Sequence, residues 1–180
     1  LSWIYITPDQ TSMKTFELWW IGALLAKNFA LILALFGGLH YYLYIRHGQG
    51  ERLRYTTKPF PTDSGRFKFR DQVKDNVFHT LASAVPVITG FEAITYWLFA
   101  NGHLGWFNFS DPVAFWGWFV FALVLAPFIH SVHFYLGHRL LHTKQLYKRF
   151  HALHHNNVQV GPWSGLSMHP VEHLIYFSSI

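Results

Sequence analysis

Histidines are concentrated in one short region near the end of the chain. Nine of the thirteen fall between His130 and His173, and five of those lie within the eighteen residues HRLLHTKQLYKRFHALHH, positions 138–155. Neutral imidazole is a common protein ligand for zinc, iron and copper. The chain contains no cysteine, so a metal in this region must be held by histidine, carboxylate or water. The residue types therefore predict a metal site built mainly from imidazoles.

The spacing of these histidines suits such a site. His138 and His142 would share one face of a helix, and His151, His154 and His155 would share another. Five imidazoles exceed the three or four that one tetrahedral site uses, so the pattern favours a pair of metal ions. The competing interpretation is a solvated basic face with incidental histidines, because the same eighteen residues contain four Lys or Arg.

Further candidate residues flank this cluster. The stretch from His169 to His173, HPVEH, also matches a zinc-protease pattern, but that site needs a third ligand downstream and an enclosing soluble domain. We expect His169 and His173 to be metal ligands or, together with Glu172, to orient a ligand imidazole through hydrogen bonds. His130 and His133 precede the cluster on the same predicted helix and are expected to contact the ligands or line a substrate pocket.

The composition indicates a membrane protein. Of the 180 residues, 51% are hydrophobic, 19% are aromatic and only 13% are charged, against about 25% charged residues in ordinary soluble domains. Apolar segments lie at about 19–45, 77–100, 112–135 and, in part, 173–180. The first three exceed the roughly 20 residues that a helix needs to cross a bilayer. Lys27, near one end of the first segment, is expected to snorkel toward the membrane surface.

The basic residues predict the orientation of these spans. Eight of the fourteen Lys and Arg residues lie in 46–76 and four more in 138–149, and three spans place both segments on the same side. The positive-inside rule makes 46–76 and 136–172 cytoplasmic. The sequence thus predicts one all-α domain over 1–180, a polytopic membrane helical bundle with a cytoplasmic histidine-rich helical cap. Nucleic-acid binding is not expected, because membrane orientation already explains the basic charge.

The histidine pattern resembles that of a known enzyme family. HRLLH, then HALHH after an eight-residue spacer, then GPWSGLSMHPVEH are similar to the fatty acid hydroxylase/sterol desaturase superfamily of integral-membrane enzymes. The resemblance covers about residues 130–177, whereas residues 1–129 share only the presence of membrane spans. The family carries a further histidine box that does not occur before Ile180. The chain is therefore expected to be an N-terminal fragment that is inactive until extended through that box.

The resemblance implies a non-haem di-iron oxygenase that hydroxylates or desaturates a lipid, either a sterol or a fatty acyl chain. The implied cofactors are two iron ions, for which zinc can substitute, and O2 is the co-substrate. No catalytic residues are expected beyond the metal ligands. Those implied ligands are His138, His142, His151, His154 and His155.

Partners and location follow from the same resemblance. The lipid substrate would enter from the bilayer, and electrons would come from a donor such as cytochrome b5 or a ferredoxin. Arg139 and Lys148 are expected to contact phospholipid headgroups or an acidic donor, unless they serve only as positive-inside charge. The implied location is the endoplasmic reticulum membrane in a eukaryote or the inner membrane in a bacterium.

Two other classes of membrane protein remain open at this point. A haem-binding membrane cytochrome would use paired histidines as axial ligands, and a Soret band would reveal it. A transporter with a histidine relay would use polar residues inside the spans, such as Lys27, Glu92 and His79. Such a transporter would move a ligand or protons without bound iron.

Overall fold

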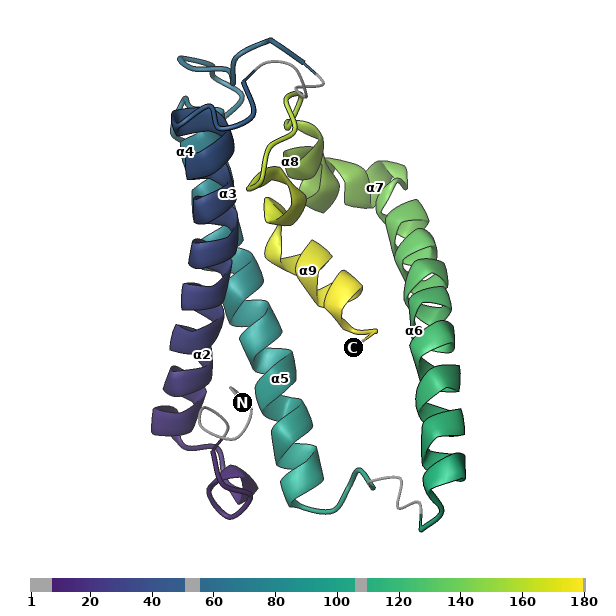
Figure 1. Cartoon of the computed structure of the whole chain (residues 1–180). Helices are drawn as coiled ribbons and strands as arrows, with labels where there is room; N and C mark the ends of the chain where they lie inside the picture. The colour runs from purple at the N-terminus through teal and green to yellow at the C-terminus, as the bar shows by residue number, and fades with distance from the viewer. Residues whose placement is uncertain (1–7, 51–55, 106–109, 180) are drawn as a thin grey trace.

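The computed structural model describes residues 8–50, 56–105 and 110–179, and within them every regular element is a helix (Figure 1). The described part contains one isolated backbone bridge of β type, between Thr62 and Asp71. The predicted all-α fold class is confirmed. Residues 106–109 of the predicted outer loop and residue 180 of the fourth apolar segment lie outside the described residues.

Three continuous helical rods are long and apolar enough to cross a membrane. The first, Leu18–Ile45, comprises α2 (Leu18–Ile32), α3 (Gly38–His40) and the π-helical turns Leu33–Gly37 and Tyr41–Ile45. The second joins α4 (Gln72–His79) through the π-helical turn Thr80–Ala84 to α5 (Val85–Ala100). The third is α6 (Pro112–Leu141). At 28, 29 and 30 residues, each rod is about 40 to 45 Å long, more than the ~30 Å of a bilayer core.

The second and third rods run further than the apolar pattern alone indicates. Asp71 begins α4 by accepting a hydrogen bond from the Lys74 backbone N–H at 2.9 Å. Asp111 begins α6 in the same way, with Pro112 at the first helical position. Hydropathy marks only the part of a helix suited to lipid, whereas caps determine where the helix itself begins. At its other end α6 continues past residue 135 to Leu141 and carries His138 in its last turn.

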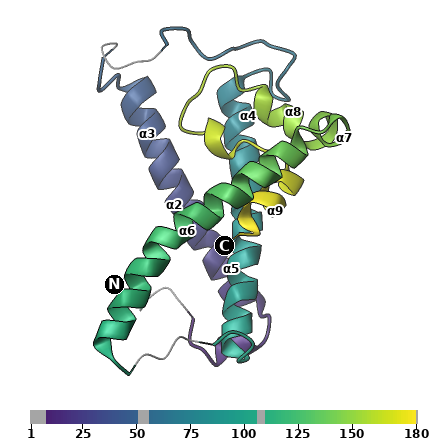
Figure 2. The same cartoon turned by 90° about the vertical axis from the view of Figure 1, so that its right-hand side faces the viewer.

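The remaining helices are short and follow α6. They are α7 (Lys144–Leu146), the π-helical turn Tyr147–His151, α8 (Ala152–His155), a 3-10 turn (Ser164–Leu166) and α9 (Pro170–Phe177); another 3-10 turn (Ser12–Lys14) precedes α2. Figures 1 and 2 show α7, α8 and residues 46–50 and 56–71 at one end of the long helices, with α9 folded back between α5 and α6.

The first two rods pack through an apolar patch and a polar group. Trp20 and Leu24 of α2 are buried against Ala93 of α5. One turn further along, Lys27 forms an ion pair with Glu92, and Glu92 also accepts a 2.8 Å hydrogen bond from another α2 side chain, that of Asn28. The expectation that Lys27 snorkels is wrong, because a carboxylate on the neighbouring helix neutralises it at its own depth.

The residues considered for a histidine relay do not form one chain of contacts. Lys27 and Glu92 contact each other, while His79 lies with Nε2 3.6 Å from Oδ2 of Asp75, one turn earlier on its own helix. No observation on the described residues therefore adds support to the transporter interpretation.

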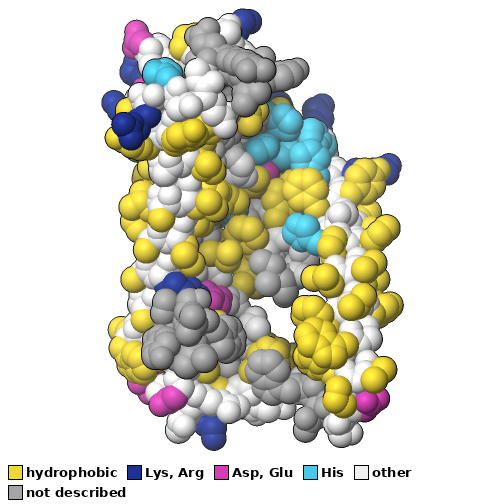
Figure 3. Space-filling view, viewed as in Figure 1, with side chains coloured by type: hydrophobic (Ala, Val, Ile, Leu, Met, Phe, Trp, Pro, Cys, Tyr) yellow, Lys and Arg dark blue, Asp and Glu magenta, His cyan; other side chains and the backbone are white. Residues whose placement is uncertain are grey.

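Helix α6 stands apart from the first two rods along most of its length. None of the residues in its most apolar stretch is buried, and its contacts are with α9 and the π-helical turn Tyr147–His151. Hydrophobic side chains cover it, and a group of histidines lies near its upper end (Figure 3). In a membrane this apolar surface would face lipid, while the end of the helix reaches the histidines.

The first turns of α4 contact the segment that follows α8 at the histidine end. Gln72 donates to Oδ1 of Asn157 at 3.3 Å, and Asn76 donates to Oγ of Ser164 at 3.1 Å. Segments far apart in the sequence are thus held together at this end, as a topology with two spans between them requires.

Single cysteines should reveal this arrangement, because the chain has no cysteine of its own. Gly65, Val160 and Gly105 are all exposed. We expect an impermeant thiol reagent to label Gly65→Cys and Val160→Cys from one side of the membrane and Gly105→Cys from the other. Labelling of Gly65→Cys and Val160→Cys from opposite sides would contradict the three-span arrangement.

Candidate metal centre

A reversal of the chain after α6 brings the two predicted histidine motifs together. His138 lies in the last turn of α6 and His142 caps it. Thr143 then adopts an extended conformation (φ −65°, ψ 145°), which turns the chain into α7. The following π-helical turn ends at His151, and α8 ends at His155. The first pair is therefore held at the end of α6 and the second on the short helical segment that follows α7, and the turn folds one pair over the other.

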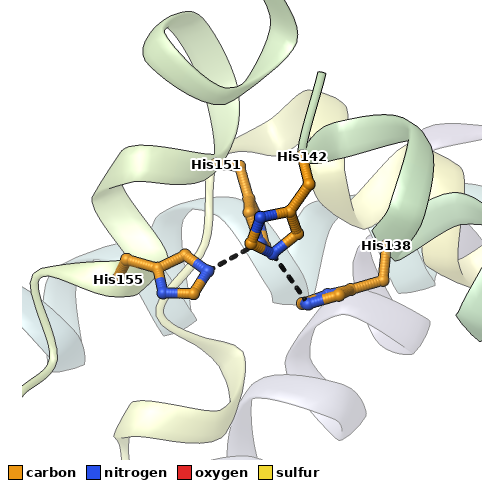
Figure 4. Close-up of side chains that lie close together, drawn as sticks. All are labelled: His138, His142, His151 and His155. Atoms are coloured by element: carbon orange, nitrogen blue, oxygen red, sulfur yellow. Dashed lines mark hydrogen bonds between the residues drawn. The ribbon is translucent and has the colours of Figure 1, made fainter. Parts of the chain in front are cut away.

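Four imidazoles converge on one point. The Nε2 atoms of His138 and His142 are 3.0 Å apart, and those of His151 and His155 are 2.9 Å apart (Figure 4). One ligand atom from each of the four rings can be chosen so that all lie within 4.8 Å of one another. The two pairs come from different segments, so neither spacing alone creates the cluster.

Two of the rings are held from behind by side chains of α9. Nδ1 of His138 lies 2.8 Å from the hydroxyl of Tyr176, and Nδ1 of His151 lies 2.8 Å from Oε1 of Glu172. When a histidine donates its Nδ1–H to an oxygen, its Nε2 is unprotonated and able to bind a metal. The hydrogen bonds thus favour the tautomers that direct Nε2 lone pairs into the cluster.

Desolvation favours the neutral form of His151 and His155. Desolvation, reinforced by the neighbouring imidazoles, lowers the pKa of His151 to about 3. Desolvation and then the charge of His142 lower the pKa of His155. Burial also raises the pKa of the Glu172 carboxyl to about 8, although its hydrogen bond with Tyr176 works in the opposite direction. Uncharged nitrogen atoms crowded together in this way are suited to share a cation.

The four rings fit a divalent metal ion. Metal–nitrogen bonds of about 2.0 to 2.1 Å in a tetrahedral site separate neighbouring nitrogens by roughly 3.3 Å. The two close pairs, at 2.9 and 3.0 Å, already lie near that separation, and the widest separation of 4.8 Å requires only a small movement of the rings. His151 is buried whereas His142 and His155 are exposed, so one side of the cluster remains accessible to other molecules.

His154 is not part of this group of four. Its ring centre lies 5.7 Å from that of His151 and 5.8 Å from that of His155. Its pKa is lowered by burial and then by His155, while a hydrogen bond with the backbone of Ser167 acts in the opposite direction. The side chain is thus directed toward the segment before α9, where it is close enough to His173 for the two to interact electrostatically.

The other candidate residues lie around the cluster. His173 is buried with Nδ1 2.8 Å from the hydroxyl of Ser83, and His169 caps α9 by accepting a hydrogen bond from the backbone N–H of Val171 at 3.1 Å. Both are therefore engaged on the far side of α9 or at its start, and neither reaches the four rings.

The candidates on α6 below the cluster contact the end of α9. Nδ1 of His130 is 3.1 Å from the hydroxyl of Ser179, and Nε2 of His133 is 3.1 Å from that of Ser178. Of the two basic candidates, Arg139 donates to the hydroxyl of Tyr135 at 3.2 Å and Lys148 is exposed.

Tyr176 is the site residue that sequence reasoning missed. It is four residues beyond Glu172, so the two share a face of α9. That i, i+4 spacing was the available signal, but a tyrosine in an apolar stretch is more often a packing residue, and its histidine partner is 38 residues away.

Comparison with known proteins gives matches to one group of lipid-modifying enzymes. Residues 123–180 match the family described as fatty acid hydroxylase. "Fatty acid hydroxylase domain-containing protein 2" of Homo sapiens is 29% identical over 113 residues, which are 60% of this chain and 30% of that protein. A Delta(7)-sterol 5(6)-desaturase of Gibberella zeae is 26% identical over 106 residues, 57% of this chain and 31% of that enzyme.

A shorter match is to another desaturase. A Delta(7)-sterol 5(6)-desaturase of Aspergillus fumigatus is 33% identical over 57 residues, which are 32% of this chain and 18% of that enzyme. The chain thus spans at most about a third of the length of these curated relatives. No solved structure matches the chain.

Proposed function

We propose that this chain, whose residues 123–180 match the fatty acid hydroxylase family and which is similar to sterol desaturases, uses histidine-bound iron and O2 to hydroxylate or desaturate a lipid. The observation that carries the proposal is the four-histidine cluster at the end of an apolar helix. A sterol or a fatty acyl chain is the substrate class that its relatives' names suggest.

Iron supplies the chemistry that amino-acid side chains lack. When bound, it would let O2 oxidise an unactivated C–H bond. Hydroxylation consumes one O2, two electrons and two protons, inserts one oxygen atom into the C–H bond and releases one water. Desaturation consumes the same reactants, removes two hydrogen atoms from adjacent carbons and releases two waters. An electron donor is therefore required for either reaction.

The residues of this chain would hold the metal and admit the lipid. His138, His142, His151 and His155 would bind the first ion through inward-facing nitrogens. Because α6 carries exposed apolar side chains along its length and His138 in its last turn, a lipid lying along α6 could reach the cluster without leaving an apolar environment.

We assign a second ion to the region around His154. Nδ1 of His154 is buried and has no hydrogen-bond partner among the described residues. A buried nitrogen without a partner is costly, and a bound cation would satisfy it, with His173 close enough to interact electrostatically with His154. Zinc could replace iron at either position, because imidazole accepts both metals.

The electron donor would approach the histidine end. Arg139 and Lys148 are exposed, as are the rings of His142 and His155, and these basic side chains could attract an acidic donor such as cytochrome b5 or a ferredoxin. By the positive-inside rule this end faces the cytoplasm, on the endoplasmic reticulum membrane in a eukaryote or the inner membrane in a bacterium.

Lipid analysis tests the proposed reaction. Cells that express the full-length protein and are supplied with iron and O2 labelled with a heavy oxygen isotope should accumulate a new lipid. That lipid should be absent from cells that express the His142→Ala variant. A product carrying one heavy oxygen atom indicates a hydroxylase, and a product two hydrogen atoms lighter than its precursor indicates a desaturase. Identical lipid profiles in the two cultures would contradict the proposal.

A further inference from the structure

We infer that Tyr176 and Glu172 act together as positioning residues, which we call the α9 clamp. Each fixes the ring of one histidine from a different pair. Together they hold the two pairs in the relative orientation that metal binding requires. The inference rests on the proposed metal centre. It adds to that centre a third helix, which supplies none of the four rings and determines how they face one another.

Glu172 holds the π-helical turn that follows α7. Its side chain and that of His151 are both 0% exposed, and their hydrogen bond of 2.8 Å is shielded from water. A hydrogen bond in such surroundings is stronger than one at the surface, and losing one partner leaves a buried polar group unpaired. His151 therefore has a single well-determined ring orientation.

Tyr176 holds the end of α6. Its side chain is only 5% exposed, and its ring centre lies 4.7 Å from that of Phe134. Packed in this way, its hydroxyl is directed at Nδ1 of His138. The exposed ring of His142 has no comparable contact with α9 among the described residues, so the orientation of the first pair depends on Tyr176.

Glu172 and Tyr176 have a fixed position relative to each other because both lie on one short helix. Glu172 and Tyr176 are four residues apart on α9, which begins with Pro170 and is capped by the His169 side chain. Apart from α9, the two pairs of histidines are joined by the chain reversal at residues 143–146 and by contacts of α6 with the π-helical turn Tyr147–His151. A rigid element that contacts both pairs therefore removes freedom that the reversal alone would leave.

A glycine allows α9 to approach α6 closely enough for this contact. A Cβ atom at Gly137 would lie 2.9 Å from Cγ2 of Ile175 and 3.6 Å from Cε1 of Tyr176. A Cβ atom here would force the Ile175 side chain to shift, whereas its distance to Tyr176 is that of an ordinary van der Waals contact. The close approach occurs directly beside His138, which is where the clamp requires it.

Cobalt binding to the purified protein tests the clamp without reference to catalysis. Co2+ is a spectroscopic substitute for iron or zinc, and its visible absorption reports the arrangement of its ligands. We expect Tyr176→Phe and Glu172→Leu to bind Co2+ about 10 to 100 times more weakly than the unmodified protein. Glu172→Gln, which keeps an acceptor oxygen for His151, should recover part of the lost affinity. The absorption bands of bound Co2+ should also change in Tyr176→Phe.

Tyr147→Phe is the matched control. The ring centre of Tyr147 lies 5.7 Å from that of His142 and 5.5 Å from that of His155, but the Tyr147 hydroxyl is not hydrogen-bonded to either imidazole. Its Co2+ affinity should be unchanged. Equal affinity and identical spectra for Tyr176→Phe and the unmodified protein would overturn the clamp while leaving the metal centre intact. Failure of the unmodified protein to bind Co2+ would overturn the metal centre and the clamp with it.

Discussion

Replacing His155 by alanine is expected to lower formation of the oxidised lipid by at least about 100-fold, more than the loss expected for residues that only orient ligands. His155 Nε2 lies 2.9 Å from Nε2 of His151, and both belong to the convergent group of four. Because His155 is exposed, its removal leaves no buried cavity, and the protein should remain folded. Product formation and metal content, measured on the same preparations, should fall together.

His103→Ala is the control for this experiment. His103 lies in the connection after α5, where its ring centre is 5.4 Å from that of Trp97, at the opposite end of the long helices. Its replacement should change neither metal content nor product formation. Equal loss of product in the two variants would show that the effect of His155→Ala is not specific to the cluster.

Breaking the ion pair between the first two rods should have the largest effect on stability. Lys27→Met leaves the Glu92 carboxylate without its cationic partner at membrane depth, and we expect a loss of about 3 kcal/mol in the free energy of unfolding. Glu92→Met should cost a similar amount for the corresponding reason. Titration of the purified protein in mixed micelles with a denaturing detergent would measure both losses.

The double variant separates pairing from packing. With both charges removed, Lys27→Met/Glu92→Met leaves no unpaired charge in the membrane, so it should be more stable than either single variant. Additive losses in the double variant would contradict the proposed pairing of α2 with α5.

The local parts of the metal centre were predictable from the sequence. Helical spacing predicts that His138 and His142 share a face, and that His151 and His155 do so, and the structure has each pair with Nε2 atoms about 3 Å apart. The same reasoning also groups His154 with the second pair. The π-helical turn ending at His151 departs from regular α-helical geometry, and the His154 ring lies away from the other four.

Contacts between distant segments were not predictable from spacing. Lys27 and Glu92 are 65 residues apart, and the sequence alone does not indicate which span faces which. Tyr176 reaches His138 only because α9 folds back against α6 at Gly137. Such contacts depend on how helices pack, and periodicity within one helix contains no information about its neighbour.

The metal content of the purified protein tests the central claim most directly. Elemental analysis with X-ray absorption spectroscopy should find iron, or zinc in its place, bound by imidazole nitrogens at close to two ions per chain. The double variant His138→Ala/His155→Ala removes one nitrogen from each pair and should lose the ion held by the four rings. Retention of the full metal content with an unchanged spectrum in that variant would contradict the assignment of these histidines as the metal centre.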